Sequence, residues 1–70
     1  MKPKLTRSQK DVLSTIKRFI DLNGIPPTRA EIAKTLVVYP NAVQEFLIIL
    51  ERKGYVKLLK GISRGIVLID

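Results

Sequence analysis

The stretch PTRAEIAKTLVVYPNAVQEFL, residues 27–47, decides the fold of this chain. Thr28 followed three residues later by Glu31 has the pattern of a capping box, in which the two residues satisfy free backbone N–H groups at a helix start. The pattern predicts a short helix over residues 29–36, a three-residue turn over residues 37–39, and then a second helix. Two helices joined by such a turn form a helix-turn-helix, whose second helix enters the DNA major groove.

The second helix of this pair is expected to begin at Pro40 or Asn41 and to run to Lys53. Proline suits a first helical turn because its missing N–H would have no partner there. Asn41 and Gln44 have the spacing of another capping box. Gly54 follows as the residue that ends the helix.

A further helix, predicted over residues 7–23, precedes the pair. Thr6 and Gln9 repeat the capping-box pattern, and apolar residues follow at helical spacing. Gly24 then supplies a residue that adopts the left-handed conformation at a helix end without strain.

The rest of the chain predicts a β-hairpin. Residues 55–60 and 66–69 are β-prone, and the glycine-bounded segment 61–65 between them is a five-residue turn. Three helices followed by a two-stranded hairpin make the winged helix-turn-helix architecture, an α+β fold that is mainly α. Because 70 residues leave no room for a second core, we expect one domain over residues 1–70.

Composition narrows the class of partner. The chain has 13 lysines and arginines against 6 acidic residues, a net charge of +7. This excess of positive charge favours a polyanionic partner. The alternative is that the protein is basic only because charge keeps it soluble. No apolar run approaches the ~20 residues of a membrane span, and no apolar signal segment follows the start. We therefore expect a cytoplasmic protein that binds double-stranded DNA and no membrane.

Groups that carry out catalysis are scarce in this sequence. It has no cysteine and no histidine, so disulfides, the usual zinc ligands and the commonest bases and nucleophiles are missing. The acidic residues are scattered, and there is no glycine-rich phosphate loop. We expect no enzyme activity, no cofactor and no metal site.

Five blocks of the sequence resemble, in order and at similar spacing, the N-terminal DNA-binding domain of the LexA repressor family. They are TRSQKDV at 6–12, PPTRAEIA at 26–33, PNA at 40–42, RKG at 52–54 and SRGI at 63–66. The resemblance covers nearly the whole chain. It implies a winged helix domain that recognises operator DNA of the SOS damage response and represses transcription by occupying a promoter.

Candidate DNA contacts come partly from the resemblance and partly from side-chain chemistry. The base-facing residues that the resemblance implies are Asn41, Ala42 and Glu45. The backbone-contacting residues that it implies are Arg52, Lys53 and Arg64. Chemistry adds Gln44, whose amide can pair with N6 and N7 of adenine. Chemistry also adds three backbone contacts, which are Arg7, Arg29 and Tyr39.

Several of these residues have a structural alternative. Asn41 and Gln44 could simply cap the second helix. Tyr39 could pack on the turn instead of contacting a phosphate or sugar. Glu45 could be an acid favoured by the positive end of the helix dipole. Each basic side chain, taken alone, could be a solvated surface charge.

The chain departs from the family pattern where DNA is read. The turn before Pro40 is one residue shorter, Tyr39 stands in place of a serine, and Gln44 stands in place of a common glutamate. The family's C-terminal domain, which dimerises and cleaves itself, is absent from these 70 residues. We interpret the chain either as a piece of a longer protein or as a small relative that lacks this domain.

Two other functions compete with specific DNA binding. Phe46, Ile48 and Ile49 lie off the inward stripe of the second helix, so they could form a protein interface, although Phe46 and Ile49 could instead pack inside. The domain could also bind nucleic acid through charge alone. If it reads a sequence, we expect two copies to pair on palindromic DNA, because one such domain buries only a small interface.

Overall fold

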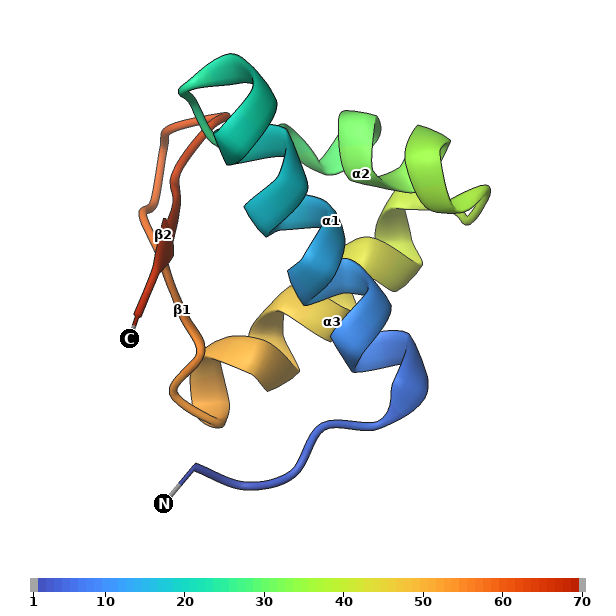
Figure 1. Ribbon diagram of the computed structural model, residues 1–70, viewed down its shortest axis with the longest axis vertical. Coiled ribbons are helices and arrows are strands. Elements are labelled where there is room, and N and C mark those ends of the chain that lie inside the picture. Colours follow the sequence, from blue (N-terminus) through green and yellow to red (C-terminus); the bar gives the residue numbers. More distant parts are fainter. Residues whose placement is uncertain (1, 70) are drawn as a thin grey trace.

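The computed structural model describes residues 2–69, which form three helices followed by an antiparallel hairpin. The elements are α1 (Arg7–Asn23), α2 (Arg29–Leu36), α3 (Pro40–Arg52), β1 (Val56–Leu58) and β2 (Ile66–Leu68). Figure 1 shows α1 crossing over α3, with α2 on one side and the hairpin along the other. The predicted winged helix-turn-helix architecture is confirmed.

Two predicted capping boxes set the starts of α1 and α2. The N–H of Gln9 donates to Thr6 Oγ1 at 3.3 Å, and the N–H of Thr6 donates to Gln9 Oε1 at 3.0 Å. The same reciprocal pair joins Thr28 and Glu31, at 3.1 Å and 2.8 Å. Gly24 ends α1 in the left-handed conformation with φ 74°. These three local predictions are confirmed.

The predicted capping box between Asn41 and Gln44 is wrong. Tyr39 is the N-cap of α3, its side chain makes no capping hydrogen bond, and Pro40 is already helical. Asn41 therefore lies inside the first turn rather than before it, while the Gln44 amide oxygen accepts from Arg29. The helix also ends at Arg52, one residue before the predicted Lys53, which is the C-cap.

The core lies where the three helices and the hairpin meet. Each helix contributes a stripe of buried side chains, and each strand contributes one. The buried apolar residues are Val12, Leu13, Ile16, Ile32, Ala33, Val43, Leu47, Leu50, Val56 and Ile66. Because a core this small leaves little spare stability, nearly all of them are needed for folding.

The hairpin is shorter in regular structure than the predicted strands. Its register pairs Lys57 with Val67 at the centre, and backbone hydrogen bonds at Leu59 and Ile69 extend the pairing past both ends. The turn needs glycine at position 65, because a Cβ there would lie 2.7 Å from the carbonyl oxygen of Leu59. A two-stranded hairpin is marginal alone in water, so its position depends on its contacts with the helices.

The N-terminal segment runs back to the hairpin. Lys2 Nζ donates to the Ile69 carbonyl at 2.7 Å, and the Tyr55 hydroxyl donates to the Pro3 carbonyl at 2.8 Å. The Lys2 ammonium also lies 4.9 Å from the centre of the Tyr55 ring. Both ends of the described chain therefore lie on the hairpin side of the molecule, away from the start of α3 (Figure 1).

The helices α2 and α3 are bent by 108° across a short turn, within the range of helix-turn-helix motifs. No single helix among residues 2–69 is long and apolar enough to span a membrane, and only this bent pair has the required length and composition. Val37 makes the turn in the left-handed conformation, with φ 56° and ψ 51°. Its neighbour Val38 donates its N–H to the Ala33 carbonyl at 3.0 Å, which closes the end of α2.

Replacement of Val37 by glycine is expected to stabilise the domain. The left-handed conformation costs a residue with a Cβ roughly 1–2 kcal/mol, and the greater freedom of unfolded glycine offsets about 0.5–1 kcal/mol of the relief. We expect the free energy of unfolding, measured by urea denaturation, to rise by about 0.5–1 kcal/mol. Val38→Gly is the matched control and should lower it, because Val38 has no positive φ to relieve.

Candidate nucleic-acid interface

One face of α3 is open to solvent along its whole length. Its exposed stripe comprises Asn41, Glu45, Ile48 and Arg52. The spacing of four, three and four residues keeps these side chains on one helix face. The opposite stripe comprises Val43, Leu47 and Leu50, which are fully buried. Packing of α3 on α1, α2 and β1 therefore leaves one face of this helix free for a ligand.

The four predicted base-reading residues do not occupy equivalent positions. Asn41 and Glu45 belong to the exposed stripe, and Gln44 lies half-buried at its edge. Ala42 is half-buried and lines a hollow between α2 and the turn, together with Lys34 and Tyr39. The structure thus brings Asn41, Gln44 and Glu45 together on α3 and sets Ala42 toward α2.

Gln44 has a side-chain partner from α2. Arg29 Nε donates to Gln44 Oε1. Arg29 is the first residue of α2, so the capping box at Thr28 fixes where it emerges. The two side chains line a groove with Ile48 and residues 58–62 of the hairpin. This groove lies between the exposed stripe of α3 and the wing.

Glu51 fixes the hairpin against α3. Its Oε2 accepts a hydrogen bond from the N–H of Leu58 at 2.8 Å. The contact satisfies a backbone donor at the end of β1 and sets the distance between that strand and the helix. Sequence patterns gave Glu51 no role, because its partner lies in another element and follows no helical spacing.

Arg64 is held within the protein rather than projecting freely from the wing. Its Nη1 donates to Glu31 Oε1 at 2.6 Å and to the Pro26 carbonyl at 2.9 Å, and Nη2 donates to Glu31 Oε2 at 3.1 Å. The guanidinium also lies 5.9 Å from the centre of the Phe19 ring. Contact of Arg64 with DNA stays a prediction, but its charge is already paired with a carboxylate.

Glu31 is the counterpart that sequence analysis had assigned only to helix capping. Hydrogen bonds from the Arg64 side chain, and then from the Thr28 backbone, lower the pKa of Glu31 from 4.5 to about 2. The same ion pair raises the pKa of Arg64. Glu31 is therefore ionised at neutral pH while it serves both the cap and the wing.

Lys53 is also occupied by the protein. Its Nζ donates to the Lys4 carbonyl and to Gln9 Oε1, each at 2.8 Å. These bonds attach the N-terminal segment and the start of α1 to the end of α3. By contrast, Arg7 and Arg52 are exposed cations. Among residues 2–69 neither takes part in an ion pair.

The turn carries an exposed apolar surface that sequence analysis missed. Val37 is 88% exposed and Tyr39 is 84% exposed, so Tyr39 does not pack away on the turn. The predicted protein interface is not one patch, since Phe46 packs against the core and Ile49 is half-buried. Ile48, 41% exposed, lies instead within the α3 stripe.

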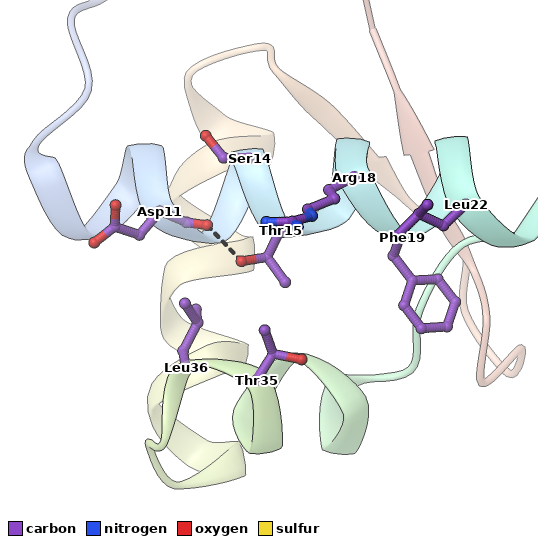
Figure 2. Close-up of a pocket in the computed structure, with 8 residues that line it drawn as sticks. All are labelled: Asp11, Ser14, Thr15, Arg18, Phe19, Leu22, Thr35 and Leu36. Atoms are coloured by element: carbon purple, nitrogen blue, oxygen red, sulfur yellow. Dashed lines mark hydrogen bonds between the residues drawn. The ribbon is translucent and has the colours of Figure 1, made fainter.

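A separate groove lies between α1 and α2 (Figure 2). Thr15, Phe19 and Leu36 point into it, whereas Arg18 runs along α1 beside Thr15. The Thr15 hydroxyl donates to the Asp11 carbonyl at 2.8 Å, an ordinary bond within the helix. Asp11 and Arg18 also line this groove, and in the part of the chain that the structure describes they form no ion pair with each other.

The helix pair, the open α3 face and the adjacent hairpin define a winged helix-turn-helix domain of the DNA-binding type. The model of the LexA DNA binding domain family matches residues 1–65. The chain belongs to this family.

The chain is similar to proteins named LexA repressor. It is 54% identical over 68 residues to the LexA repressor of Marinomonas sp. (strain MWYL1), a match that covers 96% of the chain and 33% of that protein. It is 52% identical over 64 residues to LexA repressor 1 of Pseudomonas putida, covering 90% of the chain and 32% of that protein. The chain therefore spans about a third of the length of these relatives.

The ion pair between Glu31 and Arg64 predicts a loss of stability in acid. The folded pKa of Glu31, about 2, lies below its ordinary 4.5, so folding favours the carboxylate. The resulting stabilisation is complete above pH 4.5 and disappears as the pH falls toward 2. We expect Glu31→Gln to flatten the decline in unfolding free energy over this interval, as measured by chemical denaturation at a series of pH values.

A matched control for this prediction is Glu45→Gln. Glu45 is exposed, and within residues 2–69 it forms no ion pair. Its replacement should leave the acid-induced decline unchanged. An equal decline in the wild-type protein and Glu31→Gln would show that the ion pair does not contribute to stability.

Proposed function

We propose that this domain binds duplex DNA at a specific sequence and represses transcription by occupying a promoter, without catalysing a reaction. The observation that carries the proposal is the open face of α3, where amide, carboxylate and guanidinium groups follow one another on a helix bent 108° from α2. A helix presented in this way fits the major groove, and hydrogen-bonding side chains on it meet base edges. Family membership supports the same function.

The proposed contacts divide into base reading and backbone positioning. Asn41, Gln44 and Glu45 face base edges, and Ala42 approaches a thymine methyl. Arg7, Arg29, Arg52 and Tyr39 contact the DNA backbone. Arg64 and Lys53 act mainly inside the protein, because their nitrogens are hydrogen-bonded to it. Two of the six backbone-contacting residues predicted from the sequence, Lys53 and Arg64, are therefore proposed to stabilise the fold more than to bind DNA.

Two copies are proposed to bind one palindromic site. A single small domain buries too little surface for tight specific binding, whereas two half-sites combine their affinities. Analytical ultracentrifugation measures how many copies of the domain bind one duplex. We expect two copies on a palindrome and one copy on a single half-site. A single copy on a palindrome at saturating protein would contradict this pairing.

Binding is best tested by fluorescence anisotropy on an SOS-type palindrome and a scrambled duplex of equal length. We expect preference for the palindrome and an affinity that falls with salt, with a log–log slope of about −3 per domain for the three cationic phosphate contacts Arg7, Arg29 and Arg52. Arg52→Ala should weaken binding to both duplexes and reduce the magnitude of the slope by about 1. Lys17→Ala, an exposed lysine in the middle of α1, is the matched control and should change neither duplex's affinity.

Equal affinity for the two duplexes would leave two explanations, which random-site selection separates. Recovery of a different preferred sequence would support specific binding with altered specificity. Recovery of no preferred sequence would contradict the proposal and favour binding by charge alone.

Ile48 distinguishes DNA binding from a protein-interaction module. Because Ile48 lies between Glu45 and Arg52 on the exposed stripe, Ile48→Lys should add a phosphate contact, raise DNA affinity and steepen the salt slope by about 1. A protein interface at this position predicts instead a change in association state, measured by ultracentrifugation without DNA. Ile49→Lys is unsuitable as the main test because Ile49 is half-buried.

A further inference from the structure

The contact between Arg29 and Gln44 fixes which way the Gln44 amide faces. Arg29 Nε donates to Gln44 Oε1 across 15 residues of sequence. A guanidinium carries five N–H donors and no acceptor, so only the oxygen of the amide can lie against it. The amide nitrogen of Gln44, with its two donors, is therefore turned away from Arg29.

The position of Arg29 is not explained by the stability of α2. It is the first residue of that helix, where the positive end of the helix dipole disfavours a cation. Within residues 2–69 Arg29 makes no ion pair, and its one side-chain hydrogen bond is to Gln44. Both side chains line the groove beside Ile48, at the edge of the exposed α3 stripe.

The pair presents one kind of hydrogen-bonding group to a ligand. The free groups of Gln44 and Arg29 are N–H donors, and the one acceptor, Oε1, lies beside a positive charge. Guanine offers two acceptors, O6 and N7, in the major groove. Adenine would have to direct its N6 amino group at Oε1 and at the neighbouring guanidinium, which repels a donor. The adenine contact predicted from the sequence is therefore disfavoured.

We propose that Arg29 is a positioning residue for Gln44, and that the two side chains together select guanine at one base pair of the binding site. The inference rests on the DNA-binding function proposed above and deepens it, because it assigns a base to one residue of α3. Arg29 acts here through Gln44 and not only as a phosphate contact.

The experiment is random-site selection from a duplex library with the wild-type domain and with Gln44→Ala. The base pair whose preference disappears in Gln44→Ala is the one that Gln44 reads. Affinities are then measured by anisotropy for two duplexes that differ only there, one with guanine and one with adenine. We expect the wild-type domain to favour guanine by about 5- to 150-fold, the range of a good paired contact.

Variants of Arg29 separate positioning from phosphate binding. Arg29→Ala should abolish most of the guanine preference in the wild-type background and change it little in the Gln44→Ala background, because the two residues act as one unit. Arg52→Ala is the matched control, since Arg52 is an exposed cation of α3 that does not bond Gln44. Arg52→Ala should weaken binding to both duplexes equally. Thermal unfolding of each variant checks that the fold is intact.

Several outcomes would overturn the inference while leaving specific DNA binding in place. One is a wild-type preference for adenine, cytosine or thymine at the Gln44-dependent base pair. Another is an Arg29→Ala variant that loses affinity for both duplexes equally and keeps its guanine preference. Unchanged base preference in Gln44→Ala would also reject it. Selection of no sequence by the wild-type domain is a separate result, because it rejects the proposed function itself.

Discussion

The ion pair between Glu31 and Arg64 is the constraint on which the relative positions of α2 and the wing depend. The hairpin has three-residue strands, too short to be stable without support. Arg64 attaches its tip to the carboxylate that also caps α2. One side chain therefore determines both where α2 begins and where the wing lies. Arg29 lies two residues before Glu31, so the same contact helps to place the Arg29 side chain beside the groove between α3 and the hairpin.

Features that depend on neighbouring residues could be predicted from the sequence. The capping boxes at Thr6 and Thr28 and the left-handed Gly24 need only three or four consecutive residues, and all three are present. The same reasoning failed at Asn41 because Pro40 already starts the helix and Gln44 has a partner in α2. A local pattern cannot distinguish a side chain that bonds its own helix from one that bonds a residue in another element.

The basic residues show the same limit for the candidate site. Charge predicts that the domain prefers a polyanion, but it does not show which cations already have partners. Lys53 binds groups 44 and 49 residues away, and Arg64 binds Glu31 across 33 residues. Tyr39 and Val37 pose the opposite case, because apolar and aromatic character favours burial while the short turn leaves both exposed. Folding topology, and not residue type, decides these positions.

The bonds that join the N-terminal segment to the hairpin have a consequence for the topology of the backbone itself. Lys2 reaches the carbonyl of Ile69, so a short peptide linker could join these two positions of the described chain into a closed ring. Such a ring would restrict the unfolded chain and so favour the native state. It would also permit new ends to be opened elsewhere on the surface. Because the join lies away from the start of α3, the order of the elements could be permuted without altering the α3 face that is proposed to meet DNA.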